Sequence, residues 1–167
     1  MSDIPTGAPV KAFIAAKRRG WFEFELYPQF WRDPISNTYY RNRKWFHVFF
    51  KETNKLRVPA KPGIYMFVVA PRHARLRDHT YIFYVGQATD LQVRFGQYQK
   101  EMRGEAETDR PRVVDFLSYF DGHVFFNYTL VPAVELTKAE DLLVDYITPW
   151  ANVRTHLKAK LGSPTTA

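Results

Sequence analysis

The sequence contains no cysteine, which excludes disulfide bonds, thiolate metal sites and cysteine nucleophiles. It also has no uninterrupted apolar run of about eighteen residues, the minimum for a membrane-spanning helix. Residues 1–17 lack the apolar core of a signal peptide. These absences predict an intracellular, cytoplasmic protein with no membrane partner. At 167 residues the chain is most simply one domain, large enough to fold without a disulfide or metal.

Acidic residues are outnumbered by basic ones, with 17 Asp and Glu against 24 Lys and Arg and a net charge of +7. This excess of positive charge favours a polyanionic partner such as nucleic acid. Aromatic residues make up 17% of the chain, a share that argues against disorder over most of its length.

The most informative stretch is residues 62–98. Residues 62–69 and 81–88 are rich in aromatic and β-branched residues, and the polar segment between them predicts a β-hairpin. The next residues predict a helix that is capped by Thr89 or Asp90. Arg94 and Tyr98 are four positions apart and therefore share one face of that helix.

The rest of the chain adds further elements. We expect a helix over residues 112–120 opened by Pro111, a strand over 123–131 and a helix over 137–147. The pattern predicts an α+β fold with a small antiparallel three-stranded β-sheet flanked by helices. Residues 59–167 form this core with a basic C-terminal tail. Residues 1–58 form an N-terminal aromatic and basic extension for substrate recognition or oligomerisation, with a helix at 10–20 and a strand at 21–27.

Two basic segments are candidates for nucleic-acid contact. In residues 39–50 aromatic side chains alternate with Arg41, Arg43 and Lys44, a mixture that stacks bases and neutralises phosphates. The alternative is a strand packed on the core with a solvated basic face. The connection between the hairpin strands carries Arg72, Arg75 and Arg77, which contact the nucleic-acid backbone or form a solvated hairpin tip.

Motifs in the core resemble those of the GIY-YIG nucleases, especially the nuclease module of the bacterial excision-repair incision subunit. The two halves of the signature are Gly63-Ile64-Tyr65 and Tyr84-Val85-Gly86. The matching positions that follow are Ala88, Asp90, Leu91, Arg94, Tyr98, Glu140, Pro149 and Asn152. The resemblance covers residues 62–153.

This resemblance implies a role for each catalytic position. Glu140 binds a single divalent cation, Mg²⁺ or Mn²⁺, because hard cations take oxygen ligands. Arg94 neutralises the charge that develops on the phosphate. Tyr65 by preference, or Tyr84, activates the attacking water, and the metal and Arg94 must lower its pKa. Tyr98 orients water or phosphate and Asn152 supports the site. Alternatively, Glu140 only closes a capping box with Thr137.

The sequence departs from the family pattern at three points. The hairpin connection is longer than is usual in the family. Gln87 stands where many members have a lysine, and Tyr98 where homing and restriction members often have a histidine. We count Gln87 among the nucleic-acid-binding residues.

The predicted function is a metal-dependent endonuclease that hydrolyses phosphodiester bonds in double-stranded DNA with water as nucleophile. The alternative is a catalytically inactive nucleic-acid-binding module on the same fold. The sequence leaves the oligomeric state open.

Overall fold

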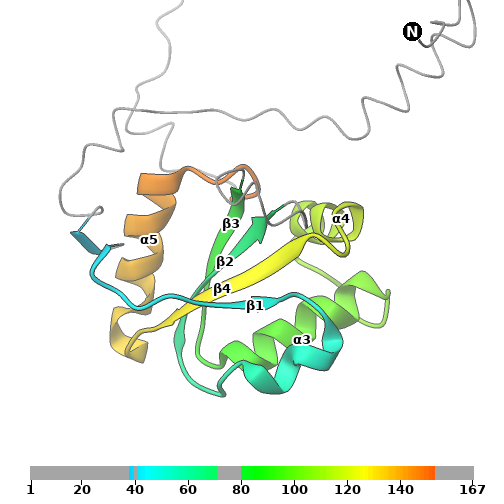
Figure 1. Ribbon diagram of the computed structural model, residues 1–167, viewed down its shortest axis with the longest axis horizontal. Coiled ribbons are helices and arrows are strands. Elements are labelled where there is room, and N and C mark those ends of the chain that lie inside the picture. The colour runs from blue at the N-terminus through cyan, green and yellow to red at the C-terminus, as the bar shows by residue number, and fades with distance from the viewer. Residues whose placement is uncertain (1–37, 40, 71–79, 153–167) are drawn as a thin grey trace, which may run out of the picture.

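The computed structural model describes residues 38–39, 41–70 and 80–152. Within them, four strands form an antiparallel sheet in the order β1-β4-β2-β3 (Figure 1). The strands are β1 Phe46–Phe49, β2 Gly63–Val69, β3 Tyr81–Ala88 and β4 Val124–Leu130. The helices are α3 Leu91–Met102, α4 Pro111–Tyr119 and α5 Leu136–Ile147, with 3-10 helices η2 Glu52–Arg57 and η4 Ala133–Glu135. The α+β class is confirmed.

The predicted number of strands was wrong, because the sheet has four strands and not three. The additional strand, β1, comes from the segment predicted as an N-terminal extension. It pairs with β4 from Phe46 opposite Tyr128 to Phe49 opposite Phe125, and it covers what would otherwise be an open edge. The rings of Phe46 and Tyr128 stack with centroids 5.3 Å apart, a cross-strand contact that favours this register.

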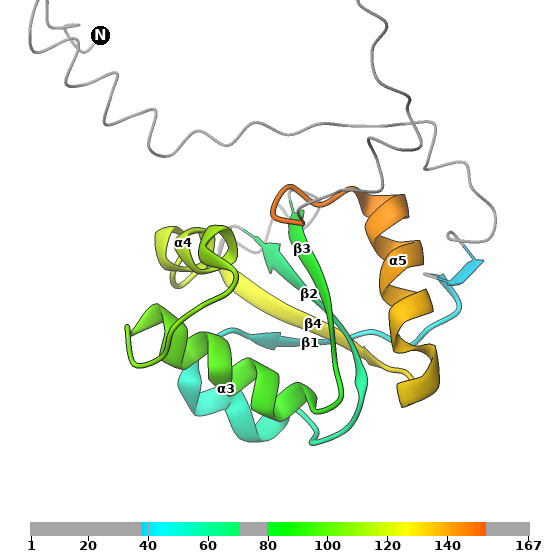
Figure 2. The same cartoon turned by 180° about the vertical axis from the view of Figure 1, so that it is seen from behind.

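The central strand β2 separates two apolar cores because successive side chains point to opposite faces. Tyr65 and Phe67 lie in one core with residues of α3 and α4. Ile64 and Met66 lie in the other with residues of α5. Figure 2 shows the result, with α3 and α4 on one side of β3 and α5 on the other. β3 is the edge strand between these helices.

The helices begin where local sequence signals place them. The carboxylate of Asp90 accepts a hydrogen bond from the Val93 amide at 2.8 Å, which identifies Asp90 and not Thr89 as the cap of α3. Pro111 occupies the first turn of α4 as predicted. Helix α5 begins at Leu136, one residue before the predicted start.

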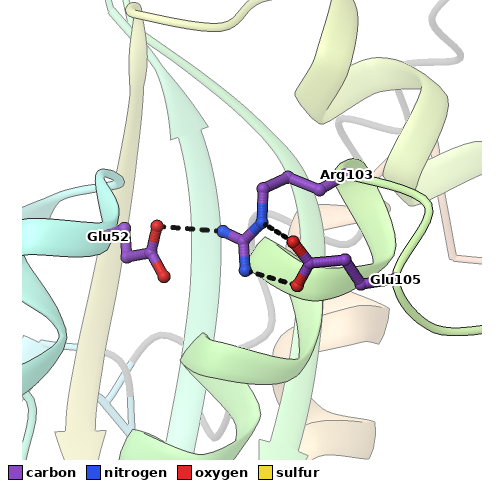
Figure 3. A network of polar contacts seen from close by, with 3 residues as sticks. All are labelled: Glu52, Arg103 and Glu105. Atoms are coloured by element: carbon purple, nitrogen blue, oxygen red, sulfur yellow. Dashed lines mark hydrogen bonds and ion pairs between the residues drawn. The ribbon is translucent and has the colours of Figure 1, made fainter.

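Helix η2, which follows β1 in the chain, is linked to the end of α3 by a network of polar contacts. The Arg103 guanidinium binds Glu105 at 2.6 and 2.8 Å and Glu52 of η2 at 3.0 Å (Figure 3). Phe50 and Val58, which flank η2, are buried in the same core as Tyr65. This network and the two apolar anchors fix the segment between β1 and β2 against α3.

Several predictions lie outside the described residues: the helix at 10–20, the strand at 21–27, the loop with Arg72, Arg75 and Arg77, and the tail beyond residue 152. The division of the chain at residues 58 and 59 stays a prediction. In the part of the chain that the structure describes, none of the helices combines the length and apolar character needed to cross a membrane.

Candidate active site

Gly86 creates the space in which the candidate site is built. It lies directly opposite Tyr65 in the β2–β3 pair. A Cβ atom at Gly86 would stand 2.5 Å from the Tyr65 hydroxyl oxygen and 2.8 Å from Cε1 of Tyr84. Both distances are too short for any side chain. Glycine therefore allows the Tyr65 ring to extend across β3 toward the outer edge of the sheet.

Three tyrosines gather above this glycine. The hydroxyls of Tyr65 and Tyr98 are 3.0 Å apart and hydrogen bonded, and both residues are 1% exposed. The Tyr84 ring lies 6.0 Å from the Tyr65 ring and 6.4 Å from the Tyr98 ring, centroid to centroid. Strand β2, strand β3 and helix α3 each supply one of these tyrosines.

The phenols of Tyr65 and Tyr98 are held in their neutral form. Burial raises the pKa of Tyr65 well above 10.0, neighbouring Tyr98 and Tyr84 raise it further, and Arg94 lowers it by less. Burial is also the main cause of the raised pKa of Tyr98. Arg94 thus acts on Tyr65 in the predicted direction, but burial outweighs it.

These shifts predict a loss of stability at alkaline pH. A group whose folded pKa is raised contributes stability that is complete below its unfolded pKa of 10.0 and is lost as pH rises through the folded pKa. Above about pH 10, the free energy of unfolding should fall by about 1.4 kcal/mol per pH unit for each phenol that stays protonated in the native state. Burial raises the pKa of Tyr81 from 10.0 to about 12. Tyr81 therefore adds to the loss of unfolding free energy between about pH 10 and pH 12.

Denaturant unfolding on both sides of pH 10 measures this slope. Tyr65→Phe should make the slope shallower, because the variant has one buried phenol fewer. A free energy of unfolding that stays constant as the exposed tyrosines ionise would contradict the account.

Arg94 is half-buried on α3, and its charge acts on both Tyr65 and Glu140. Tyr98 lies one helical turn further along α3. The shared face predicted from the spacing therefore carries both Tyr98 of the tyrosine cluster and Arg94, whose charge acts on Tyr65 and on Glu140 of α5. This places a permanent guanidinium charge beside the groups that the sequence predicts to bind phosphate.

Glu140 approaches the edge of the sheet from the opposite side, on α5. The alternative in which Thr137 and Glu140 form a capping box is wrong, because the cap position of α5 is Glu135 and both residues lie inside the helix. Burial raises the pKa of Glu140, Gln87 lowers it by hydrogen bonding, and Arg110 and Arg94 lower it by their charge. Glu140 forms no ion pair among the described residues.

This carboxylate fits a site for one hard cation. Among residues 38–39, 41–70 and 80–152, no cluster of three or more His, Cys, Asp or Glu side chains is arranged to hold a metal. A Mg²⁺ ion retains several waters and needs only one or two carboxylates together with phosphate oxygens. Half-buried and without an ion pair among the described residues, Glu140 meets that requirement.

Asn152 anchors the chain after α5 to the outer edge of β3. Its side-chain oxygen accepts from the Val85 amide at 2.9 Å, and its side-chain nitrogen donates to the Val85 carbonyl at 2.8 Å. The Ala151 amide donates to the Phe83 carbonyl at 2.8 Å. Asn152 thus supports the backbone next to Tyr84 and Gly86 as a positioning residue.

Removing this amide should destabilise the protein. Asn152→Ala leaves the buried backbone groups of Val85 without partners, at a cost of about 1–3 kcal/mol. Asn152→Asp retains the acceptor but sets a carboxylate oxygen against the Val85 carbonyl, and it should cost a similar amount. Thermal unfolding measures both variants, with Asn42→Ala at an exposed position as the control. Equal stability of the three variants would contradict the anchoring role.

Three of the predicted nucleic-acid-binding residues that the structure describes, Arg41, Arg43 and Lys44, make their contacts outside this cluster or are exposed. Arg43 lies 4.1 Å above the Tyr39 ring and pairs with Glu135 at 3.3 Å, and Lys44 lies 5.1 Å from the Phe46 ring centroid. Arg41 is exposed. Of the four predicted binding residues within the described ranges, only Gln87 reaches the site, where its amide nitrogen is 3.5 Å from the Thr137 hydroxyl oxygen.

The sequence analysis missed Arg110. This residue precedes α4 and lines a pocket of about 430 Å³ together with Tyr84 and Asn152. Its charge acts on all three tyrosines and on Glu140. An arginine before a helix-opening proline belongs to none of the motifs above, so the residue pattern gave no signal for it.

Comparisons with known proteins support a likeness of fold. No protein-family model matches the sequence, and no match was found among curated proteins. The fold is similar to solved structures of the GIY-YIG N-terminal endonuclease domain of UvrC from Thermotoga maritima. Two are point mutants bound to the catalytic divalent cation, and a third holds magnesium.

These three structures have TM-scores of 0.43, 0.43 and 0.42 and share 20% sequence identity with this chain. Each match covers 62% of this chain and 99% of the solved domain. These solved domains belong to the family that the sequence motifs resemble, and the similarity is one of fold alone. Roles for individual residues of this chain rest on the contacts described above.

Proposed function

We propose that this protein is a metal-dependent endonuclease that hydrolyses phosphodiester bonds in double-stranded DNA. One observation carries this proposal: Tyr65, Tyr84 and Tyr98 cluster at Gly86, and the charges of Arg94 and Arg110 act both on this cluster and on the half-buried carboxylate of Glu140. Hydrolysis of a phosphodiester bond needs this combination of groups. The site must bind the phosphate, neutralise the negative charge that develops on it in the transition state, and move a proton.

Glu140 would hold one divalent cation, Mg²⁺ or Mn²⁺, through its carboxylate. When bound, such a cation supplies Lewis-acid neutralisation of charge on the scissile phosphate. Arg94 binds the phosphate oxygens from the face of α3 through its planar fork of donors. The positive charges of Arg94 and Arg110 also lower the pKa of Glu140, which favours the ionised carboxylate that a cation requires.

Water is the nucleophile in the proposed reaction. Its oxygen forms a bond to phosphorus, and the bond from phosphorus to the leaving oxygen breaks. The hydroxyl of Tyr84 accepts the proton of the water while passing its own proton to solvent in the pocket, and the leaving oxygen takes a proton from solvent. Tyr84 fits this relay better than Tyr65, because Tyr84 lines the pocket, whereas Tyr65 is 1% exposed and hydrogen bonded to Tyr98. Tyr65 and Tyr98 then hold the wall of the site in place.

The second candidate function is a nucleic-acid-binding module without catalysis. The net charge of +7 favours nucleic-acid binding in either case. Glu140 distinguishes the two functions, since a carboxylate near phosphate opposes simple binding of a polyanion unless a cation lies between them.

A labelled DNA duplex, incubated with the protein in Mg²⁺ and separately in EDTA, separates these functions. The endonuclease binds in both solutions and cleaves in Mg²⁺ only. Binding that weakens with salt but yields no product in Mg²⁺ or Mn²⁺ would favour the binding module. Neither binding nor cleavage would overturn both functions.

A further inference from the structure

Arg110 lines a pocket that adjoins the candidate site. Its side chain is 29% exposed, and the pocket it lines includes Tyr84 of β3 and Asn152 of the segment after α5. A pocket of about 430 Å³ is large enough for a phosphodiester group with its adjoining sugar atoms. The candidate site and this pocket share Tyr84, so the pocket adjoins the site.

The guanidinium of Arg110 is only partly neutralised by its surroundings. Among the described residues, its one ion pair joins Nη1 to the Asp109 carboxylate at 3.1 Å, and the Asp109 side chain is 75% exposed. Ion pairs with such exposed partners contribute little and exchange readily with solvent. A guanidinium has five N–H donors, so most of them stay available to a ligand in the pocket.

The charges of Arg110 and Arg94 both act on Tyr65 and Glu140. Burial lowers the pKa of Arg110, and the Tyr98, Tyr84 and Tyr65 phenols together with Asp109 raise it by more. The Arg110 charge also lowers the pKa of Glu140, as the Arg94 charge does. Two cations, one from α3 and one from the start of α4, therefore act on one carboxylate and one group of phenols.

We propose that Arg110 is a second phosphate-binding arginine, and that the pocket between Tyr84, Asn152 and Arg110 holds a phosphate of the DNA backbone next to the one bound by Arg94. This proposal rests on the endonuclease function proposed above and adds a binding residue to it. Two guanidinium groups on separate elements fix the path of the DNA strand across Tyr84. One alone would hold a phosphate without setting the direction of the strand.

The test is the salt dependence of duplex DNA binding in EDTA, where no cleavage occurs. Each phosphate contact contributes about one unit to the slope of log affinity against log salt concentration. Arg110→Gln should reduce the slope by about one unit and weaken binding to all sequences alike. Arg103→Gln is the matched control, because it makes the same charge change at a guanidinium that Glu52 and Glu105 already bind. It should leave the slope unchanged.

A second measurement uses the unaltered protein. DNA should protect Arg110, but not Arg103, from an arginine-specific dicarbonyl reagent, with the modified residues identified by mass spectrometry. Equal slopes for Arg110→Gln and Arg103→Gln, or no protection of Arg110 in the complex, would overturn the proposal for Arg110. Cleavage by the wild-type protein in Mg²⁺ would still support the endonuclease. The failure of one proposal is thus distinguishable from failure of the other.

Discussion

Gly86→Ala should abolish most of the cleavage activity and destabilise the fold, although it adds a single methyl group. The new Cβ would lie 2.5 Å from the Tyr65 hydroxyl oxygen and 2.6 Å from its Cζ atom. Tyr65 has no room to retreat, since its ring stacks on Phe126 with centroids 5.0 Å apart and its hydroxyl is bound to Tyr98. Overpacking of this kind costs about 1–3 kcal/mol. A displacement of reacting groups by about 1 Å lowers the rate about a hundredfold.

Gly96→Ala is the matched control for this prediction. Its Cβ would approach Cε and Nζ of Lys55 at 2.9 and 3.0 Å, but these atoms are the end of a flexible side chain that can turn aside. Alanine in the interior of α3 is also favoured over glycine by about 0.5–1 kcal/mol. Gly86→Ala should therefore have both a lower melting temperature and a lower cleavage rate than Gly96→Ala. Equal effects on both measurements would show that Gly86 is an ordinary strand residue.

Glu140→Gln should remove divalent-cation binding and cleavage while leaving the fold intact. Glutamine has nearly the same shape but lacks the negative charge that a hard cation requires. Because burial makes the ionised form of Glu140 costly, loss of the charge should leave stability unchanged or slightly increased. The cleavage rate should fall by at least about 10³-fold, the scale of removing a principal electrostatic group.

The variant is measured by calorimetric titration with Mn²⁺ and by its thermal unfolding. Asp141→Asn provides the control, because it makes the same charge change at the adjacent exposed position of α5. Manganese binding by Glu140→Gln with the affinity of the wild type would assign the cation to other residues.

Local patterns predicted the elements that carry the tyrosines. Two runs rich in aromatic and β-branched residues, 63–69 and 81–88, identified the hairpin, and the capping residues Thr89 and Asp90 identified the start of α3 to within one position. These signals are strong because each one depends on residues that are close in the sequence. Sequence spacing alone also placed Arg94 and Tyr98 on one helical face.

The sequence offered a strand within residues 39–50 only as an alternative and did not place it in the sheet, for a physical reason. Strand β1 is four residues long, and exposed and buried positions do not alternate along it, because its first two residues are exposed and its last two are half-buried. Its pairing with β4 depends on contacts such as Phe46 with Tyr128, which are distant in sequence. Tertiary contacts determine whether such an edge strand forms, so the strand cannot be predicted from local propensity.

The same limit applies to parts of the candidate site. Thr137 and Glu140 matched the spacing of a capping box, but the chain enters α5 through η4 and places both residues inside the helix. Arg110 has its role only because the start of α4 packs beside Tyr84 and Asn152. The sequence analysis preferred Tyr65 over Tyr84 as the group that activates water, and the sequence alone carries no information on how deeply each tyrosine is buried.

The most direct test of the central claim is conversion of a supercoiled plasmid by the wild-type protein and by Glu140→Gln. Each is incubated with Mg²⁺, then with EDTA, then with Mg²⁺ restored in excess. The wild type should nick or linearise the plasmid in Mg²⁺, stop in EDTA and resume when Mg²⁺ returns, while Glu140→Gln leaves the plasmid supercoiled throughout. Cleavage by the wild type in EDTA, or cleavage by Glu140→Gln at the wild-type rate, would contradict a metal-dependent nuclease built around this carboxylate.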